Sequence, residues 1–163
     1  MLPAVTCVVL AHVPVGDAGA SALAAALDRG ALPRLKILYL HTAAIGDAGL
    51  VALAPALRRR PALERLYFDG NLFGDKGLAA LVAPPPADAP LPQAEALAQL
   101  KWLDLGNTQI ADDGCAHLAS RLRSGALPAL ELLELDERRA SRSDAAVAAV
   151  YEARPGLGSQ RPR

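Results

Sequence analysis

The sequence predicts an α/β fold in which a short strand and a helix alternate along the chain about five times. Two blocks of residues carry this prediction, because both recur in the same order and at a similar spacing. Self-similarity with a period of roughly 20–50 residues is the signature of a solenoid, whose units stack on one another. Composition agrees: 163 residues, 52% hydrophobic but only 4% aromatic, suit one domain with an aliphatic core.

The first block is a six-residue apolar segment that predicts a short strand. It starts near residues 5, 35, 63, 100 and 130, and reads VTCVVL, LKILYL, LERLYF, LKWLDL and LELLEL in turn. Apolar residues alternate with other residues toward its end, which is typical of a strand with one buried face. The steps between copies are near 30 residues, except for a longer step between the third and the fourth.

The second block predicts a helix after each of the first four strands. It reads VGDAG at 15–19, IGDAG at 45–49, FGDKG at 73–77 and IADDG at 110–114. A leucine follows four residues later in every copy, which gives the period of an amphipathic helix. The aspartate can cap the helix, and the glycine lets the helix approach the strand. We expect one helix column to be buried at Ala22, Ala52 and Ala80, and its fourth member, His117, to be partly buried.

Together, the pattern Leu-x-x-Leu-x-Leu and the Gly-Asp-x-Gly block resemble the ribonuclease-inhibitor-like class of leucine-rich-repeat proteins, over roughly residues 2–154. The resemblance implies a leucine-rich-repeat solenoid, a short horseshoe with parallel strands on its concave face and helices on its convex face. The asparagine ladder position of that class is kept at Asn71. The other copies have Val13, Ala43, Thr108 and Arg138 there.

Three segments depart from the repeat. A proline-rich insertion at about 84–92 lengthens the third unit, and we interpret it as a tolerated loop rather than a ligand for an aromatic groove. The fifth unit lacks the Gly-Asp block, but a helix can begin after Ser141 or Ser143. The repeat domain is therefore predicted over 1–154, and a disordered tail over 155–163. Because no polar cap precedes Val5, either the first unit is the cap or the chain is part of a longer solenoid.

The residues that alternate with the leucines are predicted to face the concave surface in three columns. They include an aromatic group and an acidic group, with basic residues (Arg58, Arg59, Arg60, Arg121 and Arg123) expected on the outer side. From these columns we predict a partner-binding site at Tyr39, His41, Arg65, Tyr67, Asp69, Trp102, Asp104, Glu134 and Asp136. An acidic inner face would attract a basic partner. The alternative is that these acidic side chains are only hydrated and bind no partner.

Charge and cysteine content exclude several classes of function. The formal net charge is zero, which disfavours a nucleic-acid or membrane-surface binder. Cys7 and Cys115 are too few for a disulfide framework, and neither a signal peptide nor a membrane span is evident. We therefore expect a cytoplasmic or otherwise intracellular protein.

The sequence contains no strong pattern of catalytic or metal-binding residues. His12, His41 and Asp69 lie near the ends of adjacent predicted strands, but no fourth ligand or nucleophile follows, so we interpret them as ordinary surface residues. No cofactor or metal site is predicted, because the Gly-Asp-x-Gly blocks belong to the repeat rather than to a phosphate loop.

The sequence therefore predicts a non-enzymatic protein-interaction module, with a monomer favoured. One alternative is a structural piece that extends a larger leucine-rich-repeat protein. The other, by family analogy only, is a regulator of a small GTPase that uses a loop arginine such as Arg138 or Arg139.

Overall fold

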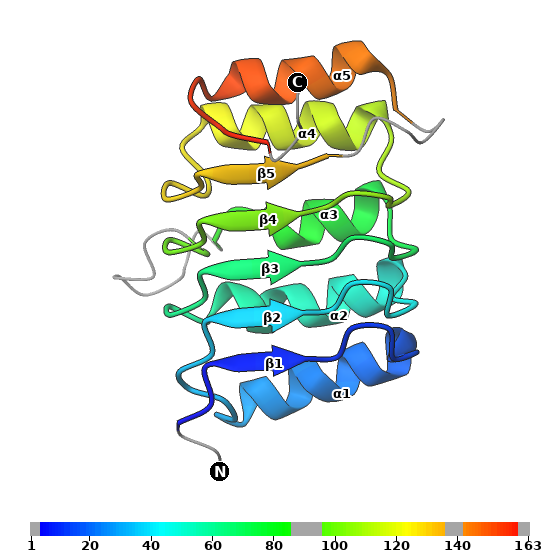
Figure 1. The fold of residues 1–163 in the computed structure, drawn as a ribbon, viewed down its shortest axis with the longest axis vertical. Coiled ribbons are helices and arrows are strands. Elements are labelled where there is room, and N and C mark those ends of the chain that lie inside the picture. Colours follow the sequence, from blue (N-terminus) through cyan, green and yellow to red (C-terminus); the bar gives the residue numbers. More distant parts are fainter. Residues whose placement is uncertain (1–3, 86–95, 136–141, 160–163) are drawn as a thin grey trace.

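The structure, a computed structural model, describes residues 4–85, 96–135 and 142–159 of the chain. These residues form five strands and five helices that alternate and stack in chain order (Figure 1). In order, the elements are β1 (Cys7–Val9), α1 (Gly16–Asp28), β2 (Ile37–Tyr39), α2 (Asp47–Arg58), β3 (Arg65–Tyr67), α3 (Asp75–Leu81), β4 (Trp102–Asp104), α4 (Asp112–Arg123), β5 (Leu132–Glu134) and α5 (Asp144–Ala153).

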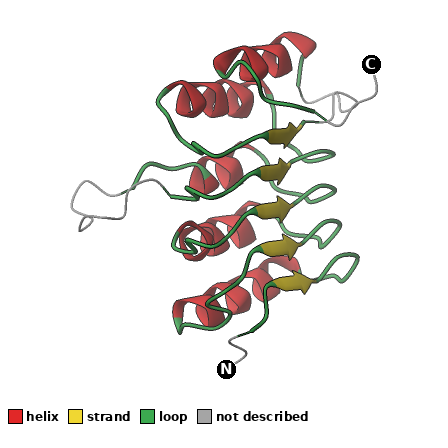
Figure 2. Ribbon diagram, turned by 60° about the vertical axis from the view of Figure 1, so that its left-hand side comes forward, coloured by secondary structure: helices red, strands yellow, loops and turns green. Residues whose placement is uncertain are grey.

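The strands form one parallel sheet with the order β1-β2-β3-β4-β5, and the helices lie on one side of it (Figure 2). Equivalent leucines of the repeat pair across the sheet, for example Leu38 with Leu66 and Leu66 with Leu103. All three are fully buried between the sheet and the helices. The predicted α/β solenoid of the leucine-rich-repeat type is therefore confirmed.

The buried face of the helices differs from the prediction. Ala22, Ala52 and His117 are exposed, whereas Ala20 and Ala24 are buried. At 3.6 residues per turn, the glycine and the residues one, four, five and eight positions after it share one face. Ala22, Ala52 and His117 lie three positions after the glycine. Helical periodicity places this position outside the buried face, toward solvent. The predictions for Ala22, Ala52 and His117 are therefore wrong.

The repeated aspartates cap the helix of the next unit, and not their own helix as predicted. Asp17 Oδ1 accepts hydrogen bonds from the backbone N–H of Gly46 (2.7 Å) and of Gly49 (3.0 Å) at the start of α2. Asp47 Oδ1 does the same for Gly74 and Gly77 at the start of α3. Asp75 Oδ1 accepts from the Ala111 N–H just before α4, and Asp112 accepts from the N–H and the hydroxyl of Ser143 just before α5. We call Asp17, Asp47, Asp75 and Asp112 the aspartate ladder. It links consecutive units because each carboxylate satisfies otherwise unpaired helix donors of its neighbour.

This ladder also explains the repeated glycine in the first turn of the helix. A Cβ atom on Gly49 would lie 2.5 Å from Asp17 Oδ1, and a Cβ atom on Gly114 would lie 2.2 Å from Asp75 Oδ1. Both distances are shorter than real Cβ contacts. The glycine therefore makes room for the carboxylate of the preceding unit.

Asn71 joins the second and third units in the loops that follow their strands. Its side chain is 1% exposed and makes four hydrogen bonds to the backbone. Oδ1 accepts from the N–H of Ala43 (3.1 Å) and Ile45 (3.0 Å), and Nδ2 donates to the carbonyl oxygens of Leu40 (2.7 Å) and Phe68 (2.8 Å). At the equivalent position in the fourth unit, Thr108 is also buried and donates to the Leu105 carbonyl oxygen (2.8 Å).

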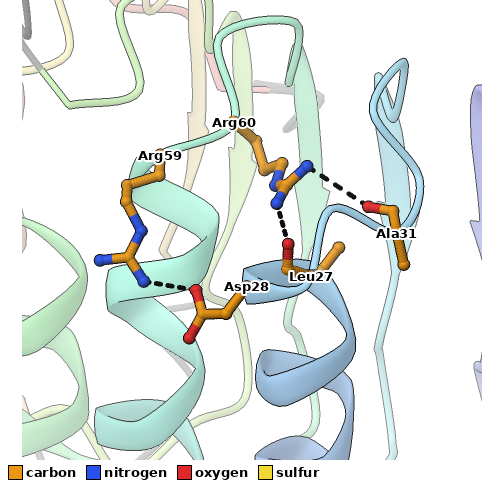
Figure 3. Close-up of polar contacts among 5 residues, drawn as sticks. All are labelled: Leu27, Asp28, Ala31, Arg59 and Arg60. Carbon is orange, nitrogen blue, oxygen red and sulfur yellow. Dashed lines mark hydrogen bonds and ion pairs between the residues drawn. The ribbon is translucent and has the colours of Figure 1, made fainter.

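Arginines hold the carboxyl ends of the helices. The Arg60 guanidinium donates to the carbonyl oxygens of Leu27 and Ala31 at the end of α1, and neighbouring Arg59 pairs with Asp28 (Figure 3). In the same way, Arg154 donates to carbonyl oxygens at the end of α4. A helix ends with unpaired carbonyl groups and a negative partial charge, so a cation there is favourable. Several of the outer arginines are thus bound to the backbone.

In the fifth unit, the structure agrees with the predicted serine cap of the helix but differs from the predicted tail. Ser143 caps α5, because its Oγ accepts a hydrogen bond from the Ala146 N–H (3.1 Å). The prediction of a disordered tail is wrong for residues 155–159, because Gly158 pairs in parallel with Leu132 of β5. Residues 160–163, and most of the predicted insertion at 84–92, lie outside the described residues.

None of the described helices has the length and apolar character needed to cross a membrane.

Candidate functional site

The candidate site is the face of the sheet whose side chains point away from the helices, the face that the repeat pattern predicts to be concave. Because side chains alternate along a strand, burial of the central leucine places its two neighbours on this face. The face is formed by three columns: Cys7, Ile37, Arg65, Trp102 and Leu132; Val9, Tyr39, Tyr67, Asp104 and Glu134; and Ala11, His41, Asp69 and Gly106. The predicted member Asp136 lies outside the described residues.

Aromatic rings form a continuous row across four units of this face. The rings of Tyr39 and Tyr67 are stacked, with centroids 4.5 Å apart and an angle of 11° between their planes. Tyr67 and Trp102 follow at 5.6 Å, and His41 contacts Tyr39 at 6.0 Å. Neighbouring strands are about 4.8 Å apart, which is close to the spacing of stacked rings. We call His12, His41, Tyr39, Tyr67 and Trp102 the aromatic ladder.

His12 is the member of this ladder that the sequence prediction missed. Its ring lies edge-on to that of His41, with the centroids 4.9 Å apart. It follows β1 and takes a left-handed backbone conformation (φ 59°). The sequence places His12 and His41 near the ends of adjacent strands, but both were interpreted as ordinary surface residues.

The environment of Tyr67 keeps its phenol protonated. Burial raises the pKa of Tyr67 above its ordinary value, the neighbouring Tyr39 adds to this effect, and Arg65 opposes it. Arg65 also lies over the Trp102 ring, with Cζ 5.8 Å from the ring centroid. The centre of the face thus offers half-buried rings with polar groups, held in place by one another.

One donor in the centre of the face is unsatisfied. The indole N–H of Trp102 is buried and has no hydrogen-bond acceptor within the described part of the chain. Most buried donors in folded proteins are paired, so an unpaired one costs stability. Trp102 is the only tryptophan in the sequence, which makes its fluorescence a specific probe of this site.

Carboxylates occupy the part of the face formed by the later units. Asp69, Asp104 and Glu134 are all half-buried, and Asp104 Oδ1 accepts a hydrogen bond from the Gly106 N–H (3.0 Å). At the second residue of the last four strand blocks, charges of opposite sign alternate at Lys36, Glu64, Lys101 and Glu131. The first two form an ion pair at 3.5 Å. This alternating row is not among the sequence predictions, although the aligned strand blocks contain it.

The histidine cluster offers no metal site. His12 and His41 touch through their rings, but within the described residues no hydrogen bond or ion pair joins the Asp69 carboxylate to either ring. Nor does the described part of the chain place any three His, Cys, Asp or Glu side chains where they could hold a metal ion. Burial raises the pKa of the Cys115 thiol, so this cysteine stays protonated and unreactive at neutral pH.

Comparison with known proteins identifies the fold and no family. A comparison with protein-family models finds no match, and neither does a comparison with the sequences of curated proteins. Among solved structures, the chain is similar to leiomodin-1 actin-binding site 2, with a TM-score of 0.70 and 18% sequence identity. The similarity covers 93% of this chain and 79% of the leiomodin-1 chain. The architecture is thus one that a solved protein also adopts, from a sequence with few identical residues.

Proposed function

We propose that this protein is a non-enzymatic interaction module that binds a protein partner through its concave face. The observation that carries the proposal is the aromatic ladder, whose Tyr39, Tyr67 and Trp102 stand half-exposed at the centre of the sheet. Tyrosine and tryptophan dominate binding hot spots because they bury much area with little loss of side-chain entropy. The repeat pattern supports the ribonuclease-inhibitor-like class for its units.

The partner that fits this face is basic. Carboxylates of Asp69 after β3, Asp104 in β4 and Glu134 in β5 flank the ladder, and Arg65 lies over Trp102. A negative patch of this kind accelerates the association of a positively charged partner. The likeness to leiomodin-1 actin-binding site 2, a protein named for binding actin, supports protein binding as the class of function. The free cysteines suit an intracellular location.

The double substitution Tyr67→Ala, Trp102→Ala tests the proposal. We expect it to weaken partner binding at least about thirtyfold, because the loss of even one hot-spot aromatic costs about 2 kcal/mol or more. Binding is measured by quantitative affinity capture from cell extract, followed by titration of the recovered partner against purified protein. In the wild type, Trp102 fluorescence should change on titration.

A matched control uses two exposed apolar residues away from the ladder, Val51 on α2 and Leu72 in the loop after β3. The variant Val51→Ala, Leu72→Ala should recover the same partners as the wild type. If the aromatic variant also recovers them with unchanged affinity, the concave face is not the binding surface.

The charge of the partner is tested by Asp104→Asn, Glu134→Gln. This change removes two charges and keeps the side-chain shapes, so we expect the association rate at low ionic strength to fall severalfold and to depend less on salt. The control Asp113→Asn, Glu152→Gln removes the same charge from exposed positions on α4 and α5. Equal association rates and salt dependence for the two variants would contradict a basic partner.

A further inference from the structure

The concave face differs from one side to the other across its width. In the column at the amino ends of the strands, Ile37, Trp102 and Leu132 are apolar and half-buried, and Arg65 lies over the Trp102 ring with Cζ 5.8 Å from its centroid. The column at the carboxyl ends is instead polar after its first member, and its described residues there are His41, Asp69 and Gly106. The face therefore has an apolar side and a polar side, which both run across the strands.

The polar side carries a half-buried carboxylate at Asp69. Its backbone carbonyl oxygen accepts from the Thr42 N–H (2.8 Å), but within residues 4–85, 96–135 and 142–159 no hydrogen bond or ion pair reaches its side chain. Asp104 and Glu134 add negative charge in the next two units. A carboxylate that has lost part of its hydration is stabilised by a cation that donates hydrogen bonds to it. A partner that covers this face should therefore present cations to its polar side.

The dimensions of the face match those of one helix. Five strands about 4.8 Å apart span about 19 Å, and three columns two residues apart span about 13 Å. An α-helix with its side chains is about 10–12 Å in diameter, and about 13 of its residues span 19 Å. A helix that lies across the strands would thus contact all three columns, whereas a single extended segment has about half that width.

The backbone of the sheet also favours a helix over an extended segment. The strands use their backbone groups on one another: the Leu40 N–H donates to the Tyr67 carbonyl oxygen (2.9 Å), and the Phe68 N–H donates to that of Asp104 (2.9 Å). An extended segment on this face would bury its own N–H and C=O groups without partners, which is unfavourable. A helix pairs these groups internally and meets the face with side chains alone.

We propose that the occupant of the concave face is a basic amphipathic helix of a partner protein, about 13 residues long, that lies across the strands. Its apolar stripe would contact Tyr67 together with Ile37, Trp102 and Leu132, and its cations would face Asp69. Carboxylates in consecutive units recur about every 4.8 Å, which is close to the rise between helix residues three apart. This inference rests on the proposed function, and it narrows a basic protein partner to one type of element with one charge pattern.

The probe is a synthetic peptide of about 14 residues, made of alanine, leucine and lysine. Its leucines recur every three or four residues, its lysines lie along one flank, and a hydrocarbon staple on the opposite side holds it helical. One control peptide has glutamate in place of lysine, a second has the same residues in an order without an apolar stripe, and a third is unstapled with two central prolines.

Each peptide is titrated into the full-length wild type and followed by calorimetry and by the fluorescence of Trp102, the single tryptophan. We expect the helical basic peptide to bind with a Kd of about 10–100 µM, and each control peptide to bind at least about tenfold more weakly.

Substitutions place the bound helix on the face. Tyr67→Ala, Trp102→Ala should weaken binding of the helical peptide at least about tenfold, measured by calorimetry because this variant lacks the fluorophore. Asp69→Asn should weaken it about threefold and reduce its salt dependence. The matched control Asp113→Asn, an exposed position on α4, should bind like the wild type. If circular dichroism shows that the aromatic variant is unfolded, Ile37→Lys replaces it, because a cation on the apolar side should cause a similar loss.

Three results would overturn the proposal. The helical peptide shows no binding below about 1 mM, the proline-containing peptide binds as tightly, or binding persists in the folded aromatic variant or in Ile37→Lys. Failure of the proposed function has a different signature, because Tyr67→Ala, Trp102→Ala would then still capture the partners from cell extract. Loss of that capture without binding of the helical peptide refutes the helix alone.

Discussion

Replacement of Asn71 by alanine is expected to lower the free energy of unfolding by about 3–5 kcal/mol. The Asn71 side chain satisfies four buried backbone groups, those of Ala43, Ile45, Leu40 and Phe68. Alanine leaves these donors and acceptors without a partner inside the fold, and it opens a void between two units. For a chain of this length the melting temperature should fall by roughly 6–20 °C, measured by calorimetry and by urea titration.

Gln109→Ala is the control for Asn71→Ala. Gln109 is an exposed polar residue in the corresponding loop of the next unit, and its contact there is made by its backbone N–H, which bonds to the Phe73 carbonyl oxygen (2.9 Å). Its replacement should change the free energy of unfolding by less than about 0.5 kcal/mol. Similar losses for the two variants would show that the amide network does not hold the second and third units together.

Replacement of Gly114 by alanine should cost about 2–4 kcal/mol, although alanine is the better helix former. The added Cβ atom would lie 2.2 Å from Asp75 Oδ1 and 2.9 Å from Ile110 Cγ2. Asp75 must then withdraw, and the Ala111 N–H at the start of α4 loses its acceptor (2.8 Å). The loss is therefore the sum of a steric shift and a broken link between the third and fourth units.

A double-mutant cycle with Asp75→Ala isolates this mechanism. Without the carboxylate, Gly114→Ala should cost at least about 1 kcal/mol less, because its main obstacle has gone. The stability of the four proteins is measured by chemical denaturation under identical conditions. If the two losses simply add, Asp75 is not the reason for glycine at this position. Gly125→Ala is unsuitable as a control, since Gly125 has a positive φ of 92° and open space around it.

These predictions separate stability from binding. Asn71 and the aspartate ladder lie between units, whereas the aromatic ladder stands on the concave face. Tyr67 and Trp102 are half-exposed, so their truncation should cost less stability than the loss of Asn71 while removing most of the binding surface. A partner that still binds the Asn71→Ala variant below its melting temperature would show this independence directly.

The sequence by itself determined the repeat, the register of the strands and most of the concave face. Leucines at fixed positions must be buried, and a strand that buries one residue exposes its neighbours. Tyr39, Tyr67 and Trp102 could therefore be placed side by side from spacing alone, and the structure places their rings in contact. Ser143 was likewise recognisable as a cap, because its partner lies three residues away in the chain.

Only the tertiary structure decided the contacts between units. The aspartates cap helices about 30 residues away, and their partners depend on how closely and at what angle the units stack, which no local pattern encodes. The same holds for the pairing of Gly158 with Leu132, for His12 in the aromatic ladder and for the exposed Ala22 and Ala52. Local periodicity specifies each unit, because burial acts residue by residue. The links between units arise from hydrogen bonds whose geometry exists only after the units have stacked.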